Sequence, residues 1–118
     1  MSHETWQEQL RRGSLDLAIL LTVSEGPRYG LAIILHLEAF TDLVVTEGTI
    51  YPILGRLTRE GLLEAEWVEG EAPHARKYYR LTRLGAKRLA NMKGEWRAFA
   101  EKIERLMAAS ERSARASH

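Results

Sequence analysis

The residues best suited to bind a partner lie in two segments, one with helical periodicity and one that is basic. Between Thr46 and Arg59, apolar residues recur at intervals of three and four, which predicts a helix with one buried face. The opposite face carries small, hydroxyl and cationic groups, including Thr49 and Arg56. An arginine on such a helix can donate two hydrogen bonds to O6 and N7 of guanine in the major groove of duplex DNA. A phosphate contact, or a plain surface position, is the alternative for Arg56.

The basic segment runs from Arg76 to Thr82 and contains no carboxylate. It follows a segment of alternating apolar and polar residues, Leu63 to Glu69, and a loop over Gly70 to Ala75. Helix, strand, turn and basic strand in this order predict a winged helix-turn-helix, which mostly binds duplex DNA. Cations on the second strand are expected on phosphates, where they position the protein and make affinity depend on salt. A solvated hairpin face is the alternative.

Several of the residues expected at the DNA also have a simple structural role. Thr46 suits a helix N-cap, and Gly48 either permits close approach of the backbone or merely relieves crowding. Tyr29 and Tyr51 can either reach phosphate or brace the domain. The predicted DNA-binding residues are Arg28, Tyr29, Thr46, Gly48, Thr49, Tyr51, Arg56, Arg76, Lys77 and Tyr78.

Three helices and a hairpin are expected to position these residues. The first helix covers about Glu4 to Ser24, and the second about Tyr29 to Ala39. The third begins at either Thr46 or Thr49, because Pro52 removes a hydrogen bond from the second turn of a helix but none from the first. The residues expected to face the core are Ile33, Leu37, Phe40, Leu63, Ala65, Trp67, Tyr79 and Leu81.

A last helix is predicted from about Arg83 to Ser110, with Thr82 as its cap. Large apolar residues follow one another along it at steps of three and four, as on the a/d seam of a coiled coil. Because a lone helix in water would not keep such a seam, we expect a two-fold dimer that pairs it with the first and last helices of a second copy. The predicted dimer-interface residues are Leu89, Met92, Trp96, Phe99, Ile103 and Leu106.

The predicted fold is therefore mainly α-helical with a small β hairpin. We expect a winged helix-turn-helix DNA-binding domain with its N-terminal helix over residues 1–82, a C-terminal dimerisation helix over 83–110, and a flexible tail over 111–118. The net charge of +1 gives little support for DNA binding. Its distribution is more informative, because acidic residues gather between Glu64 and Glu71 and cations follow between Arg76 and Arg83.

Composition and motifs argue against several other classes of protein. The chain has no cysteine, and its four histidines fit no metal-ligand spacing. No Ser–His–Asp set, phosphate loop or dinucleotide-binding glycine motif is present. We therefore expect a protein that is not an enzyme and uses no cofactor or metal. The polar start and the short apolar runs predict a cytoplasmic protein without a membrane partner.

With these residues in view, the chain resembles the PadR family of bacterial transcriptional regulators. The resemblance covers about residues 8 to 108, and Glu95 to Arg97 in the last helix contributes to it. The other segments that carry it are Leu10–Asp16, Gly26–Gly30, Glu47–Pro52 and Arg76–Thr82. The short C-terminal part is similar to the smaller of the family's two size classes.

The resemblance implies a homodimeric repressor of a transporter, stress or detoxification operon, bound to an inverted-repeat operator on double-stranded DNA. In some members a planar hydrophobic effector stacks on tryptophans of the C-terminal helices, and Trp96 occupies the corresponding position. Asp16 either lines the same pore or lies at a wetter edge of the dimer. Two other interpretations remain: a protein-interaction module built on a winged-helix scaffold, and a small-molecule sensor that does not bind DNA.

Overall fold

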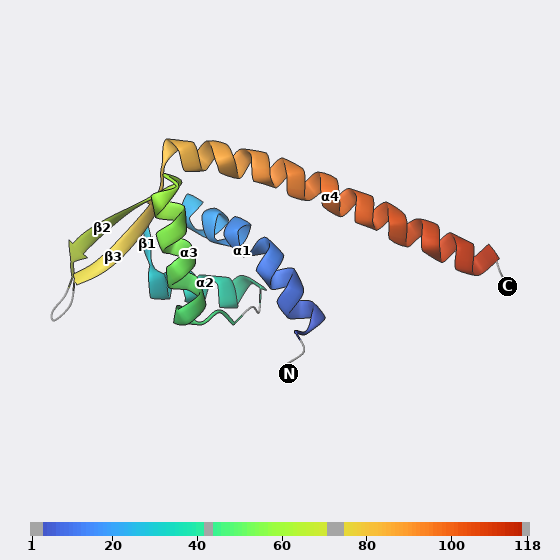
Figure 1. The fold of residues 1–118 in the computed structure, drawn as a ribbon, viewed down its shortest axis with the longest axis horizontal. Helices are drawn as coiled ribbons and strands as arrows, with labels where there is room; N and C mark the ends of the chain where they lie inside the picture. Colours follow the sequence, from blue (N-terminus) through green and yellow to red (C-terminus); the bar gives the residue numbers. More distant parts are fainter. Residues whose placement is uncertain (1–3, 42–43, 71–74, 117–118) are drawn as a thin grey trace.

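The computed structural model describes residues 4–41, 44–70 and 75–116, which form four helices and a three-stranded antiparallel sheet (Figure 1). The predicted mainly α-helical fold with a β hairpin and a long C-terminal helix is confirmed. Most of the predicted hairpin loop and part of the turn before the third helix lie outside the described residues. The elements are α1 (Trp6–Ser24), β1 (Arg28–Tyr29), α2 (Gly30–Thr41), α3 (Glu47–Arg59), β2 (Leu63–Glu69), β3 (Ala75–Leu81) and α4 (Arg83–Ala116).

The N-terminal end of α1 is held by a capping box. The hydroxyl of Thr5 accepts a hydrogen bond from the backbone N–H of Glu8 (3.1 Å), and the Glu8 carboxylate accepts one from the N–H of Thr5 (3.0 Å). The helix therefore begins at Trp6, slightly later than expected. It packs against both α2 and α4, which explains why its middle is apolar on more than one side.

Helix α3 begins at Glu47, so Pro52 lies inside the helix rather than in its first turn. Thr46 is the N-cap by position, with an extended backbone, but its hydroxyl makes no capping bond to a backbone N–H. It lies 3.2 Å from the hydroxyl of Thr49 instead. The missing N–H of Pro52 removes one bond from the second turn, and the buried face of Ile50 and Leu54 compensates by packing in the core.

The end of α3 is a Schellman motif that turns the chain into β2. Gly61 has a φ of +80°, a conformation that favours glycine. The N–H of Leu62 donates to the carbonyl of Leu57 (3.0 Å), and that of Gly61 to the carbonyl of Thr58 (3.0 Å). Leu62 and Leu63 then enter the core directly, so the hairpin starts in a fixed direction from the end of α3.

The core lies between α1, α2, α3 and the inner end of the hairpin. Ile33 and Leu37 of α2 are buried, as predicted, but Phe40 is 76% exposed. That prediction is wrong because α2 runs past the edge of the core, where the ring of Phe40 stacks on His36 at a centroid distance of 4.6 Å. The fully buried side chains are Ile19, Leu20, Val23, Ile33, Ile50, Leu54, Leu57, Leu62 and Leu63.

The hairpin pairs β2 with β3 over seven positions, from Leu63 opposite Leu81 to Glu69 opposite Ala75. Leu63 and Tyr79 are buried, as predicted from the alternation, but Trp67 is 67% exposed. The prediction for Trp67 is wrong because the hairpin projects beyond the domain in Figure 1 and the core ends after Ala65. Side chains alternate between the two faces of the hairpin as expected, but on the core-facing side only the half nearest the domain is covered.

Helix α4 leaves the domain as a long arm (Figure 1). It has 34 residues, which corresponds to about 51 Å. Thr82 caps it as predicted, since its hydroxyl accepts from the N–H of Gly85 (2.9 Å) and donates to the carbonyl of Gly61 (2.6 Å). The helix continues to Ala116, so its predicted end at Ser110 is corrected.

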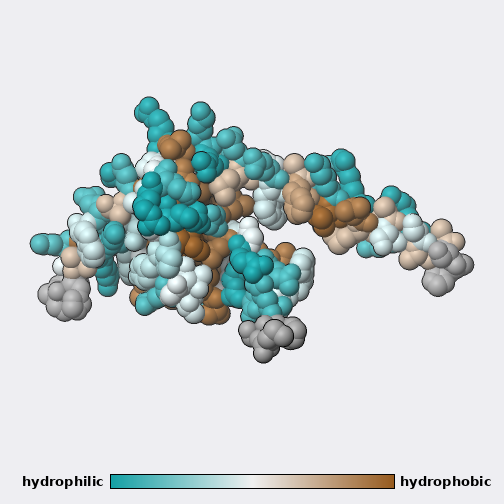
Figure 2. All heavy atoms as spheres, viewed as in Figure 1, coloured by the Kyte–Doolittle hydropathy of each residue, from teal (hydrophilic) through white to brown (hydrophobic). Residues whose placement is uncertain are grey.

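The predicted seam of α4 divides into two parts. Leu89 is buried in the core of its own domain and Met92 packs against that core, which corrects the assignment of Leu89 to a dimer interface. Further along, the seam positions are exposed, and Figure 2 shows hydrophobic side chains gathered along the lower side of the arm. The exposed apolar residues of this part are Trp96, Phe99, Ile103, Leu106 and Met107. None of the helices in the described ranges is both long and apolar enough to cross a membrane.

Candidate nucleic-acid interface

A concave surface of about 540 Å³ opens between α3 and the hairpin. We call it the helix–wing cleft. It brings together four predicted residues from three separate segments, Tyr29, Tyr51, Arg76 and Lys77. Its lining consists of Tyr29, Gly30, Tyr51, Gly55, Trp67, Ala75, Arg76, Lys77 and Tyr79.

The short strand β1, which the sequence did not predict, positions one edge of this cleft. Tyr29 pairs with Tyr78 across β1 and β3, and their rings meet edge to face at a centroid distance of 5.5 Å. The guanidinium of Arg76 lies 4.5 Å from the centroid of the Tyr29 ring, in cation–π geometry. The other residue of β1, Arg28, forms an ion pair with Glu25 at an N···O distance of 3.8 Å. The two-residue pairing therefore ties the start of α2 to the basic strand.

Two cations of the hairpin keep their charge available to a partner. Neither Arg76 nor Lys77 has a carboxylate partner within the parts of the chain that the structure describes. The ammonium of Lys77 lies 5.8 Å from the ring centroids of both Trp67 and Tyr79. Arg80 differs, because it forms an ion pair with Glu64 (2.9 Å). Aromatic contacts orient the first two cations without neutralising them.

Tyr51 is seated on a glycine that the sequence analysis did not single out. A Cβ atom on Gly30 would lie 2.5 Å from the hydroxyl oxygen and 2.5 Å from Cε1 of Tyr51, which is far closer than atoms of this kind approach. The ring is held over the first residue of α2 while remaining partly exposed in the cleft. The only sequence signal for this role is a glycine directly after Tyr29.

Deeper in the cleft, Tyr79 is almost completely buried. Burial, with a smaller contribution from Tyr51, raises the pKa of the Tyr79 hydroxyl above its ordinary value. Tyr79 is therefore a neutral residue under physiological conditions. It forms the floor of the cleft, whereas the charged groups lie at its rim.

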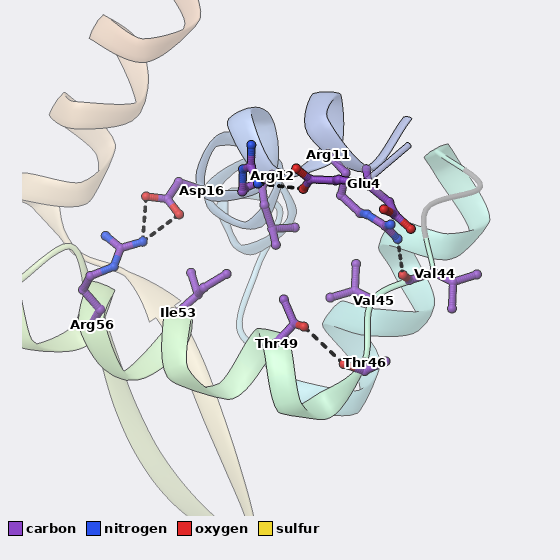
Figure 3. A pocket seen from close by; sticks show the side chains of 12 residues that line it. Glu4, Arg11, Arg12, Asp16, Val44, Val45, Thr46, Thr49, Ile53 and Arg56 are labelled. Atoms are coloured by element: carbon purple, nitrogen blue, oxygen red, sulfur yellow. Dashed lines mark hydrogen bonds and ion pairs between the residues drawn. The ribbon is translucent and has the colours of Figure 1, made fainter. Parts of the chain in front are cut away.

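The first turn of α3 presents the predicted residues Thr46, Gly48 and Thr49 to solvent. Gly48 has open space around its Cα, since a Cβ added there would meet the Thr46 hydroxyl as its nearest group, at 3.8 Å. Thr46 and Thr49 also line a second concave surface, between α1 and α3, of about 640 Å³ (Figure 3). These residues lie at the N-terminal end of α3 and do not line the helix–wing cleft.

Arg56 and Asp16 point toward one another across that second surface (Figure 3). Nη2 of Arg56 lies 2.8 Å and 2.9 Å from the two carboxylate oxygens of Asp16, and Nη1 lies 3.1 Å from Glu60. The hydrogen bond to Asp16 and its charge raise the pKa of the Arg56 guanidinium. The structure thus places Arg56, predicted at DNA, and Asp16, predicted at an effector, in one ion pair outside the helix–wing cleft.

A groove of about 300 Å³ separates α1 from α4 and contains Trp96. Its walls are mostly apolar, with Leu17, Ala18 and Leu21 from α1 facing Trp96. Asp16 does not line it. We call this the α1–α4 groove; its remaining lining residues are Ser14, Lys93 and Arg97. Within the described ranges, no group of three His, Asp or Glu residues is arranged to hold a metal ion.

The family model of PadR-like transcriptional regulators matches residues 19–91. The chain belongs to the PadR-like family. This PadR-like chain is 34% identical over 98 residues to an uncharacterized protein of Lysinibacillus sphaericus, with 81% of the chain and 90% of that protein covered.

Solved structures agree with the family assignment of this PadR-like chain. A PadR-like transcription factor from Bacteroides fragilis is 37% identical with a TM-score of 0.73, covering 85% of this chain and 96% of that one. A PadR family regulator from Eggerthella lenta is 34% identical with a TM-score of 0.76, covering 84% and 86%. A PadR-like regulator from Bacillus cereus is 30% identical with a TM-score of 0.76, covering 84% and 96%. The predicted PadR-like winged-helix regulator is confirmed at this level.

Proposed function

We propose that this PadR-like regulator is a homodimeric repressor that binds double-stranded DNA through its helix–wing cleft. The observation that carries the proposal is the pair of cations, Arg76 and Lys77, held by aromatic rings at the rim of a concave surface beside α3. Phosphate contacts from such cations position a protein on a duplex. The exposed first turn of α3 would then meet the edges of the bases in the major groove.

Dimerisation is supported by the apolar residues that α4 leaves uncovered. Phe99 is 64% exposed and Leu106 is 65% exposed, and both lie on the same seam as Trp96 and Ile103. Fully burying each such side chain is worth about 1.5–3 kcal/mol. Packing α4 of a second copy against this seam would therefore stabilise a dimer. A two-fold dimer would place two α3 helices in major grooves about 34 Å apart, and its operator would be an inverted repeat.

The α1–α4 groove supports control by a small hydrophobic effector. Its apolar walls and the exposed indole of Trp96 suit a planar aromatic molecule. The effector would release DNA only by binding better to the arrangement of the dimer that does not fit the operator. Asp16 is not needed for this role, because it is paired with Arg56. The regulated genes are proposed to be a transporter, stress or detoxification operon.

Two measurements test the proposal. Sedimentation at micromolar concentration should give a dimer, and a gel-shift with the region upstream of the chain's own gene should show retardation that weakens as salt rises. A stable monomer would overturn the dimer. Absence of retardation at low salt, with random DNA as well, would instead favour a protein-interaction module.

The effector is tested separately by titrating planar aromatic compounds while recording tryptophan fluorescence. The wild type should respond and Trp96→Ala should not. Equal responses in both proteins would remove Trp96 from the proposed site. A response to such compounds in a protein that binds no DNA would favour the small-molecule sensor.

A further inference from the structure

Trp67 is a large aromatic residue on the wall of the helix–wing cleft, and most of its surface is exposed. It is 67% exposed and lines the cleft together with Tyr51 and Lys77. A single exposed apolar residue is ordinary on a protein surface. The position of Trp67 is what matters, because it lines the same cleft as the exposed Tyr51 of α3 and the hairpin cations Arg76 and Lys77.

The register of the hairpin places an ammonium group beside the indole. Trp67 lies directly opposite Lys77 on the sheet face that continues outward from Leu63 and Ala65. Nζ of Lys77 is 5.8 Å from the Trp67 ring centroid, close enough for a cation–π contact. A flat apolar surface and a positive charge are therefore presented side by side toward the cleft.

The acidic residues of β2 are mostly kept off this face. Glu64 and Glu66 lie on the opposite face, in register with Arg80 and Tyr78, and Glu64 is paired with Arg80. Glu69 shares the face of Trp67 nearer the loop but does not line the cleft. The wall of the cleft around Trp67 is therefore apolar and cationic, although the strand that carries Trp67 is rich in glutamate.

We propose that Trp67 packs against a deoxyribose of the bound duplex while Lys77 holds the adjacent phosphate. The inference rests on the proposed DNA binding and adds a contact residue to it. A nucleic-acid backbone alternates apolar sugar surface with anionic phosphate, which matches the pairing of indole and ammonium. Stacking on a base is not expected, since stacking platforms act on single strands, whereas a duplex keeps its bases paired.

The test compares Trp67→Ala and Trp67→Phe with the wild type in fluorescence anisotropy. Two labelled duplexes are used: the region upstream of the chain's own gene and a random sequence of equal length. Trp67→Ala should weaken binding to both by about tenfold, with Trp67→Phe close to wild type, because the ring supplies apolar area rather than a base contact. The salt dependence should keep its slope, because no charge is removed.

Val68→Ala is the matched control, since Val68 is the next residue on β2 and faces the other side of the sheet. It should bind both duplexes like the wild type. A second measurement does not depend on the alanine variant folding well: acrylamide quenching of tryptophan emission. DNA should shield part of the emission in the wild type, and that shielded part should be missing in Trp67→Phe.

The outcomes separate this inference from the proposed function. If the wild type binds neither duplex at low salt, the proposed DNA binding itself fails. If the wild type binds and Trp67→Ala binds equally well, only the role of Trp67 is overturned. A loss confined to the upstream duplex would also overturn it, because a backbone contact carries no sequence information.

Discussion

Arg56 of α3 and Asp16 of α1 are joined by hydrogen bonds of 2.8 Å and 2.9 Å, although forty residues separate them in the chain. Together with the hydrogen bond from Arg11 to the carbonyl of Val44 (2.6 Å), this ion pair ties α1 to α3 and to the turn that precedes it. Because α1 also forms a wall of the α1–α4 groove, the pair connects that wall to α3.

Asp16→Asn should therefore lower both stability and DNA affinity. The two side chains are 40% and 43% exposed, so solvent screening limits the loss of stability to roughly 0.5–1 kcal/mol. Urea unfolding and fluorescence anisotropy would measure the two effects. Glu101→Gln, which breaks the exposed Glu101–Arg105 pair on α4, is the control and should leave DNA affinity unchanged. Unchanged affinity in Asp16→Asn would show that the ion pair does not position α3.

Gly30→Ala should weaken DNA binding through Tyr51. The new methyl group would displace the Tyr51 ring from its seat, and we expect a loss of up to about tenfold in affinity, on the scale of one lost contact. In a Tyr51→Ala background the same substitution should have no further effect, because contacting residues are not additive.

Gly13→Ala serves as the control for Gly30→Ala, since a Cβ on Gly13 of α1 would meet nothing within 4 Å. It should keep the DNA affinity of the wild type and gain stability from its better helix propensity. If Gly30→Ala weakens binding by the same factor with and without Tyr51, the glycine acts on something other than that ring.

Arg76→Ala and Lys77→Ala should weaken DNA binding about equally on all sequences. Each substitution would remove one of the proposed phosphate contacts, so the dependence of log affinity on log salt should flatten by about one unit per cation. Anisotropy titrations at several salt concentrations would measure this. Arg80→Ala is the comparison, because Arg80 is already paired with Glu64. The salt slope of this variant should stay near wild type. A change restricted to one operator base would contradict the phosphate role.

Phe99→Asp should convert the proposed dimer to a monomer. Phe99 is an exposed residue of the α4 seam, and a carboxylate buried there without a partner would be strongly unfavourable. Sedimentation would show the change, and operator affinity should fall with it. Ala98→Asp introduces the same charge on another face of the same turn, where the residue is also exposed, and should remain dimeric. Dimers of equal stability in both variants would rule out this seam.

Tyr79→Phe should make the domain more resistant to alkali. Folding raises the pKa of the Tyr79 hydroxyl because the group is buried, so the native state holds this proton more tightly than the unfolded chain. The resulting stabilisation is complete below the unfolded pKa of about 10 and is lost as pH rises through the higher folded value. The free energy of unfolding should therefore fall less above about pH 10 in Tyr79→Phe than in the wild type. In the control variant Tyr78→Phe, the free energy of unfolding should fall above about pH 10 as much as in the wild type.

Local patterns in the sequence determined most of the elements of this protein. The periodicity of α3 and α4, the cap at Thr82, the alternation of the hairpin and the uninterrupted cations at Arg76 and Lys77 are all visible within a few neighbouring residues. Such signals depend on backbone geometry and short-range hydrogen bonds, so they can be interpreted without knowing the fold. Together with the family resemblance, they predicted the winged helix and its arm correctly.

Tertiary structure alone decided which faces were covered and which distant charges met. Trp67 and Leu89 both occupy apolar positions of a periodic pattern, yet the first is exposed and the second is buried, because the core ends partway along the hairpin and extends under the start of α4. Arg56 meets Asp16, and Tyr29 meets Arg76, through packing of segments far apart in the chain. Periodicity states which side of an element is apolar, but the extent of burial and the choice of partner depend on how the elements pack in three dimensions.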